Sequence, residues 1–231
     1  MTGTPAPGNS GLLVADGVAV ELDGAELLAP TTLALAAGTC VAVRGQNGAG
    51  KTTLLRVLSG RLRPTAGSVR LAGDALDERR ADHRAAVAAL IEPPTLYPDL
   101  TIQDQLALIE AAWSGARSGS RSEPLERAAI AAPGFGSGAI DHFGLEGLRT
   151  RFPHELSSGQ RQLVSLAVTF ARPASVLLLD EPEQRLDPDR RGLVAKAIER
   201  ARAQGVAVAF ATHDPELVAR VADAEVVVGV A

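Results

Sequence analysis

The fold of this chain is decided by one stretch of its sequence, Gly45-Gln46-Asn47-Gly48-Ala49-Gly50-Lys51-Thr52-Thr53. An apolar run over 40–43 precedes the stretch, and apolar residues follow it at helical spacing over 54–58. The order strand, glycine loop, helix is typical of a phosphate-binding loop, in which glycines leave backbone N–H groups free to surround phosphate oxygens. The N-terminus of the helix adds positive potential. The plain alternative is a glycine-rich turn before a helix.

The residues at the end of this stretch carry the expected chemistry. Lys51 is placed to meet the β- and γ-phosphates of a nucleotide, and the hydroxyl of Thr52 is placed to bind Mg²⁺. Thr53 lies one residue further into the same anion-facing turn. The stretch therefore predicts a nucleotide site, with all of its residues expected at the phosphates.

A second motif stands at the end of another apolar run. Residues 176–182 read Val-Leu-Leu-Leu-Asp-Glu-Pro, so that Asp180 and Glu181 follow a strand-like segment. Ligands of open α/β sheets bind at the carboxyl ends of strands, where these two carboxylates would lie. Asp180 is suited to Mg²⁺, directly or through water, and Glu181 is placed to polarise an attacking water as a general base. The alternative is a solvated strand terminus.

The order of elements predicts an α/β fold, that of a P-loop NTPase with a mostly parallel core sheet. Continuous apolar runs such as Val176–Leu179 and Val206–Phe210 are typical of strands buried on both faces. Further strands are predicted at Leu12–Ala15, Val18–Leu22, Leu33–Leu35, Cys40–Val43, Ser68–Leu71, Val87–Ile91 and Glu225–Val228. Helices are predicted at Ile102–Trp113, Leu125–Ala132, Ser158–Phe170, Arg190–Ala203 and Pro215–Val221. The first two of these helices belong to a predicted helical insertion.

Composition excludes several classes of protein. The chain has 231 residues, 46% of them hydrophobic and 22% charged, as an ordinary globular protein has. Its net charge of −4 offers no basic surplus, so nucleic acid is not an expected partner. The single cysteine, Cys40, lies in an apolar run and is expected in a strand core. No run of about 18 apolar residues occurs, so no direct membrane insertion is expected, and residues 1–11 are expected to form a flexible leader without a secretion signal.

Three more motifs complete the pattern. Leu156-Ser157-Ser158-Gly159-Gln160 begins a predicted helix with Ser157 or Ser158 as its N-cap, and alone this signal is weak. Leu186-Asp187 and Thr212-His213-Asp214 follow. With its motifs in this order, the chain from about Leu12 to Val228 resembles the ATP-binding subunit of an ABC transporter. In that resemblance 45–53 is similar to Walker A, 156–160 to the signature sequence, 176–181 to Walker B, 186–187 to the D-loop and 212–214 to the switch histidine.

The resemblance implies an ATPase that binds ATP and Mg²⁺, with Glu181, His213 and Lys51 as its catalytic residues. His213 is expected to contact the γ-phosphate and the attacking water. Two subunits are expected to pack head to tail, so that the signature of one closes over the γ-phosphate held by the other. The residues then expected at the nucleotide, besides the phosphate loop, are Leu22, Ser157, Ser158, Gly159, Gln160 and Asp187.

The resemblance also implies an organisation and partners. A single ABC ATPase domain is expected over 12–231, with an N-terminal antiparallel β portion and a helical subdomain inserted at about 93–172. The expected partners are a transmembrane permease subunit and a second ATP-binding subunit, in a homodimer or a heterodimer. The expected location is the cytoplasmic face of the cell membrane, as a peripheral subunit.

The chain departs from the family pattern at several positions. Glu92 stands where the family usually has a glutamine that links Mg²⁺ to the permease, and we expect it near the metal. Such a glutamate is similar to that of antibiotic-exporter and bacteriocin-immunity members, which favours export. Leu22 stands where the family has an adenine-stacking aromatic, so weak base discrimination is expected. Before the D-loop, 183–185 read Glu-Gln-Arg instead of the usual small residues.

Three apolar residues after Glu92, namely Leu96, Tyr97 and Leu100, are candidates for contact with the permease. The alternative is that they pack inside the helical insertion. Two other functions remain open at this point: a soluble ABC ATPase that acts on a cytoplasmic assembly, and a nucleotide-gated clamp with negligible turnover.

Overall fold

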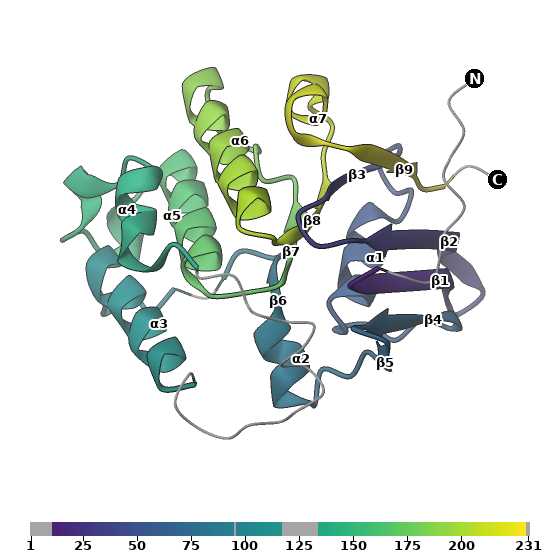
Figure 1. The fold of residues 1–231 in the computed structure, drawn as a ribbon. Coiled ribbons are helices and arrows are strands. Elements are labelled where there is room, and N and C mark those ends of the chain that lie inside the picture. Colours follow the sequence, from purple (N-terminus) through teal and green to yellow (C-terminus); the bar gives the residue numbers. More distant parts are fainter. Residues whose placement is uncertain (1–10, 95, 117–133, 230–231) are drawn as a thin grey trace.

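The computed structural model of the chain describes residues 11–94, 96–116 and 134–229. These residues form two β-sheets with helices packed around them (Figure 1). The predicted helix Leu125–Ala132 and all of the predicted leader except Gly11 lie outside the described residues.

The larger sheet is parallel throughout, as the continuous apolar runs predict. Its strands, in spatial order, are β6 (Val87–Leu90), β7 (Val176–Asp180), β8 (Ala207–Ala211), β3 (Cys40–Arg44) and β9 (Ala224–Val227). Successive residues of β7 belong to two hydrophobic clusters, Leu177 and Leu179 to one and Val176 and Leu178 to the other. The strand therefore lies between two packed layers, which is why its sequence shows no polar alternation.

The smaller sheet is antiparallel and is built from the N-terminal part of the chain. Its strands, in spatial order, are β2 (Ala25–Leu35), β1 (Leu13–Leu22), β4 (Ala66–Leu71) and β5 (Asp74–Ala75). The two strands predicted at 12–15 and 18–22 are one strand in the structure, because β1 continues through a register shift between Ala15 and Val18. Helix α1 (Lys51–Leu58) packs its apolar face into a cluster that both sheets share.

The remaining helices pack on the parallel sheet or against the helices that do. They are α2 (Ala81–Ala86), α3 (Ile102–Ala116), α4 (Ala139–His142), α5 (Ser158–Ala171), α6 (Pro188–Ala203) and α7 (Pro215–Val221), with 3₁₀ turns η1 (Gly136–Gly138), η2 (Glu146–Leu148) and η3 (Pro153–Glu155). Helices α3, α4 and α5 lie at the end of the molecule away from the antiparallel sheet (Figure 1). Helix α6 begins two residues before the prediction, because Asp187 caps its N-terminus. Within the described ranges, no helix has the length and apolar character that crossing a membrane requires.

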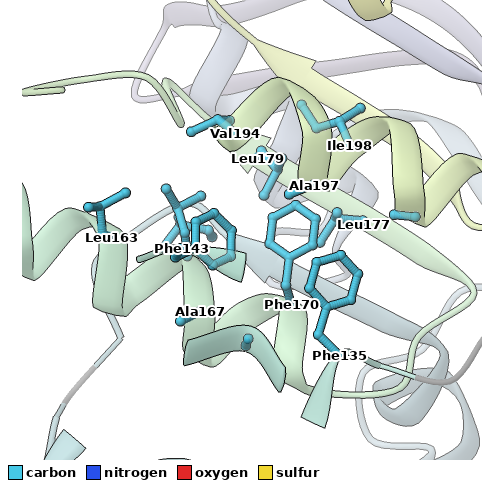
Figure 2. Close-up of a cluster of buried hydrophobic side chains, with 14 of the residues drawn as sticks. Phe135, Phe143, Leu163, Ala167, Phe170, Leu177, Leu179, Val194, Ala197 and Ile198 are labelled. Carbon is cyan, nitrogen blue, oxygen red and sulfur yellow. The ribbon is translucent and has the colours of Figure 1, made fainter. Parts of the chain in front are cut away.

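Aromatic side chains join the helical segment to the parallel sheet. The ring of Phe170 lies 5.3 Å from that of Phe135 and 5.6 Å from that of Phe143, measured between centroids. These rings pack beside Leu177 of β7 and Ile198 of α6 in one buried cluster (Figure 2). The helices between β6 and β7 thus share a core with the sheet, and the boundary of about 93–172 for a helical subdomain stays a prediction.

Cys40 is fully buried in β3, as expected of a strand residue. Burial raises the pKa of its thiol to about 12, because the thiolate would lose its hydration. The thiol is therefore protonated at neutral pH and is a poor nucleophile.

We expect Phe143→Ala to lower the free energy of unfolding by about 3–5 kcal/mol, because it removes a fully buried ring from this cluster. Urea unfolding followed by circular dichroism measures the change. Leu108→Ala is the matched control, since Leu108 is 46% exposed on α3 and its truncation should cost less than about 1 kcal/mol. Equal losses in the two variants would contradict the assignment of Phe143 to the core.

Candidate functional site

The glycine loop connects the carboxyl end of β3 to the N-terminus of α1, as predicted. Gly50 is the N-cap of α1, with φ of 97°. A Cβ at this position would lie only 2.6 Å from the carbonyl oxygen of Leu27 in β2, so that no larger residue fits. The antiparallel sheet thus packs directly against the loop and holds its backbone in place.

Lys51 lies folded along this loop and is only 7% exposed. Its Nζ donates hydrogen bonds to the carbonyl oxygens of Gly45, at 2.9 Å, and Gln46, at 3.1 Å. It also lies 2.9 Å from Nε2 of His213. An ammonium group only donates, so Nε2 is the acceptor of this contact. The amine is therefore held at the loop by oxygens that a phosphate group can replace.

Thr52 and Asp180 form the candidate metal site. The hydroxyl of Thr52 donates to Oδ2 of Asp180 at 2.6 Å, which joins the start of α1 to the end of β7. Burial raises the pKa of Asp180, the neighbouring Glu181 raises it further, and the hydrogen bond from Thr52 opposes the shift. No group of three or more His, Cys, Asp or Glu side chains able to hold a metal occurs in the described part of the chain. A hydroxyl with one carboxylate suits Mg²⁺, which takes its other ligands from phosphates and water.

Glu181 and His213 face each other across the ends of β7 and β8. Oε1 of Glu181 lies 3.6 Å from Nε2 of His213, while Oε2 accepts a hydrogen bond from Gln184 at 2.8 Å. The backbone of Glu181 has φ of 44°, a conformation that few residues other than glycine adopt, and its N–H donates to the carbonyl oxygen of Ala211 at 2.9 Å. The structure therefore brings Lys51, Glu181 and His213 together from three separate elements.

A cleft of about 740 Å³ opens beside the glycine loop. Its lining includes Gly45, Gln46, Asn47, Gly48, Ala49 and His213, together with residues at the end of β9. The first five of the predicted phosphate-binding residues, 45–49, therefore line a space large enough for a polyphosphate group. Thr53 follows Thr52 in the first turn of α1.

The signature residues lie elsewhere on the chain. Ser157, of the two serines considered, is the N-cap of α5: it accepts from N–H of Gln160 at 3.2 Å, and its own N–H donates to Oε1 of Gln160 at 2.9 Å. A Cβ on Gly159 would lie 3.0 Å from the carbonyl oxygen of Arg185, so this helix end touches the turn before the D-loop. Ser158 is the first residue of α5.

Asp187 has a capping role in this chain. Its carboxylate accepts from N–H of Arg190 at 2.9 Å and lies 3.4 Å from the guanidinium of the same residue. Among the described residues, no hydrogen bond or ion pair joins Asp187 or 157–160 to the loop at 45–53. The predicted site residues thus fall into two groups on one chain.

Glu92 and Leu22, the two site residues that depart from the family pattern, both lie at the surface. Glu92 forms an ion pair of 2.7 Å with Arg56 of α1, which balances the negative charge expected near the metal. Leu22, at the end of β1, is 59% exposed and stays available for contact with a flat ligand.

Sequence reasoning missed Arg56 and the burial of Glu183. The position of Arg56, one helical turn after Thr52, could have indicated the first, whereas nothing in the sequence indicated the second.

A glycine loop at a helix N-terminus, set against an Asp-Glu pair and a histidine at neighbouring strand ends, defines a P-loop nucleoside triphosphatase. Comparison with known proteins identifies the family: residues 28–184 match the family described as ABC transporter. The chain belongs to this family. It is an ATP-binding subunit and an ATPase that uses Mg²⁺, and subunits of this kind work in dimers with a transmembrane permease.

The alignments with named relatives cover most of this chain. The thiamine import ATP-binding protein ThiQ of Salmonella typhimurium is 35% identical, over 85% of this chain and 79% of its own length. The hemin import ATP-binding protein HmuV of Gloeobacter violaceus is 36% identical, over 92% of this chain and 76% of its own length. Both align with the chain along most of their own sequence.

Solved structures share the fold. The ATP-binding subunit of an ABC transporter superposes with a TM-score of 0.76 and 26% identity, covering 94% of this chain and 85% of its own. The ATP-binding cassette MJ0796, solved as a dimer bound to ADP and Pi, has a TM-score of 0.74 at 22% identity and covers 94% of each chain. The second likeness is one of fold alone. The P-loop fold predicted from the sequence is confirmed.

We expect Leu22→Tyr to tighten ATP binding by about 1 kcal/mol and to increase its preference over GTP, because an aromatic ring stacks on the base. Calorimetric titration with each nucleotide measures both effects. Leu108→Tyr, which adds the same ring to an exposed position on α3, should leave both affinities unchanged. An unaltered ATP affinity in Leu22→Tyr would place the base against other residues.

Proposed function

We propose that this subunit hydrolyses ATP with Glu181 as general base and drives a separate transmembrane permease, to which it binds as a peripheral subunit at the cytoplasmic face of the membrane. The observation that carries the proposal is the convergence of Lys51, Glu181 and His213 beside the Thr52–Asp180 pair. Each group needed to hold a triphosphate and to act on water comes from the end of a parallel strand or the helix that follows it.

The binding steps follow from the contacts. The loop N–H groups and the N-terminus of α1 hold the phosphates, and Lys51 exchanges the carbonyl oxygens of Gly45 and Gln46 for phosphate oxygens. Thr52 and Asp180 would hold Mg²⁺, which would supply positive charge to the phosphates. The hydrogen bond between Thr52 and Asp180 already brings their two oxygens within 2.6 Å of each other.

Glu181 then acts on water. Gln184 holds one of its carboxylate oxygens, and the other faces His213, so the carboxylate has a fixed orientation toward the histidine. We assign it the removal of a proton from the attacking water, and we assign His213 the contact with that water and the γ-phosphate.

The separation of the two residue groups supports a dimer that closes head to tail on two ATP molecules. In the described ranges, no hydrogen bond or ion pair joins the N-terminus of α5, with Ser157, Ser158 and Gly159, to the loop of its own chain, although a helix N-terminus is suited to binding an anion. Gln160 is engaged in the cap, and Asp187 holds the neighbouring helix, so both shape this surface. The phosphates bound by one subunit would complete the site at the signature of its partner.

The direction of transport rests on two opposing observations. Glu92 at the position of the usual glutamine supports export, and its ion pair with Arg56 shows how the extra charge is accommodated. The named relatives are import proteins and support import. Uptake of labelled substrates into inverted and right-side-out vesicles distinguishes the two. Purification from detergent, with or without a polytopic membrane protein, separates both from a soluble ATPase that acts on a cytoplasmic assembly.

The candidate contact with the permease is the loop before α3. Leu96 packs against the large buried cluster and Leu100 is half-buried, whereas Tyr97 is 57% exposed, so the three residues do not all pack inside. The buried side chain of Gln105 accepts from N–H of Tyr97 at 3.1 Å, which fixes the loop to α3. A fixed loop that presents one exposed aromatic suits an amphipathic helix of the permease.

We expect Glu181→Gln to keep ATP binding, to abolish turnover and to accumulate a closed dimer, because the amide cannot accept the proton of water. Phosphate release and size-exclusion chromatography measure the two results. Lys51→Ala is the contrasting variant and should weaken ATP binding itself, since it deletes a phosphate contact. Turnover equal to that of the parent in Glu181→Gln would remove this residue from the mechanism.

We expect Tyr97→Asp to abolish association with the permease and to leave the fold and ATP affinity nearly intact, because it adds a charge at an exposed apolar contact. Co-purification from detergent measures association. Ser68→Asp, on the exposed side of β4 in the antiparallel sheet, adds the same charge as a control. Unfolding of Tyr97→Asp would show that the residue belongs to the core, and unaltered association would place the docking surface elsewhere.

A further inference from the structure

Glu183 is a buried carboxyl group in the wall of the site. It stands two residues after Glu181, in the turn that follows β7, and is 7% exposed. Glutamate is almost never buried unless it is paired, because its charged form loses hydration. Yet Oε2 of Glu183 has no hydrogen-bond partner among the residues that the structure describes. Burial raises the pKa of this carboxyl, and the nearby charges of Asp214 and Glu181 raise it further.

The other oxygen of Glu183 makes a specific contact. Oε1 accepts a short hydrogen bond from the hydroxyl of Thr212, which is fully buried at the end of β8. The same hydroxyl oxygen accepts from N–H of Asp214 at 2.9 Å. A hydroxyl has one proton to donate, so its orientation is fixed once it accepts from Asp214 and donates to Glu183. The residues on both sides of His213 are therefore tied, through Thr212, to the turn that carries Glu181.

A second connection runs between the same two segments. The N–H of Glu181 donates to the carbonyl oxygen of Ala211 at 2.9 Å. With this bond alone, the end of β8 could still rotate about the backbone beyond Ala211. The Glu183–Thr212 hydrogen bond adds a side-chain attachment past that point, immediately before His213. Two attachments on successive residues determine where the imidazole stands relative to Glu181 and Lys51.

The Glu183–Thr212 pair would lower the stability of the fold if it served structure alone. Apolar side chains of similar shape would avoid the unpartnered Oε2 and the desolvation of the carboxyl. A polar group in such a place, close to the reacting groups, points to a role in the site.

We propose that Glu183 is a positioning residue for His213: through Thr212 it holds the imidazole between Glu181 and Lys51. This inference rests on the proposed function, because it assigns Glu183 a role only if Glu181 and His213 act on the γ-phosphate and water. Glu183 itself contacts neither.

The test compares five variants in ATPase assays over a range of ATP concentrations. Glu183→Ala and Thr212→Val should each lower kcat about tenfold and leave KM nearly unchanged, because misplacing a reacting group slows the chemical step. Glu183→Gln should stay within about twofold of the parent, because its amide oxygen still accepts from Thr212. Thr169→Val removes another buried hydroxyl, which donates to the carbonyl oxygen of Ser165 in α5, and should leave kcat unchanged. The double variant Glu183→Met, Thr212→Val should lower kcat as much as either single variant.

The double variant also separates positioning from stability. It removes the unpartnered Oε2 of Glu183 but also the hydroxyl that accepts from N–H of Asp214, so these two effects on stability oppose each other. Its melting temperature should therefore stay within a few degrees of that of the parent while kcat stays low. A readout without nucleotide comes from the ring signal of His213 in carbon-detected NMR, assigned by its loss in His213→Ala. This signal should move in Glu183→Ala and stay in place in Glu183→Gln.

Three results would overturn the proposal: a parental kcat in the double variant, a rise in KM without a fall in kcat, or a loss in Glu183→Gln equal to that in Glu183→Ala. Failure of the proposed function can be told apart from failure of the positioning role. The proposed function fails only if Glu181→Gln still hydrolyses ATP. If Glu181→Gln is inactive while Glu183→Ala is fully active, only the positioning role fails.

Discussion

The site depends on the in-register pairing of three parallel strands. Val43 of β3 pairs with Ala211 of β8, and Ala211 pairs in turn with Asp180 of β7, so that these three residues form one row across the sheet. The chain leaves the sheet directly after this row in β7 and β8, and one residue later, after Arg44, in β3. It continues there into the Glu181 turn, the segment of His213 and the glycine loop. A slip of one residue in either pair would exchange the faces of a whole strand and bury the wrong side chains. The hydrophobic clusters on both faces therefore set the distances between the reacting groups.

Those two clusters also determine what each layer contributes. On one face, α1 packs between the two sheets, and the contact of Gly50 with Leu27 of β2 holds the loop. On the other face, the aromatic cluster connects α5 to the sheet, so that the signature end is carried on the same framework as the strand ends. The glycine loop is thus held by residues that contact it directly. The signature residues at the N-terminus of α5 are instead positioned by the packing of the rest of that helix.

Much of this architecture could be predicted from the sequence, because its signals are local. The glycine loop, the acidic strand end and the capping serine can each be recognised within a few consecutive residues, and the continuous apolar runs indicate the parallel strands. The course of β1 could not be predicted, since Gly17 and its neighbours resemble a turn until β2 and β4 pair across them. The Arg56–Glu92 and Glu183–Thr212 contacts join residues far apart in the chain. Such pairs depend on the tertiary fold, so no spacing rule reveals them.

The attachment of α5 at its C-terminal end makes the helix a lever. Arg172, which follows its last turn, donates to the carbonyl oxygens of Arg84, at 2.9 Å, and Val87, at 3.3 Å, and its guanidinium lies 4.7 Å from the centre of the Trp113 ring. Ser157 stands at the opposite end, and a helix of 14 residues spans roughly 21 Å. A tilt of about 10° about the arginine would therefore sweep the serine through about 4 Å, which exceeds the reach of a hydrogen bond. A small rotation where α2, α3 and β6 meet would thus be amplified into the making or breaking of contacts at Ser157.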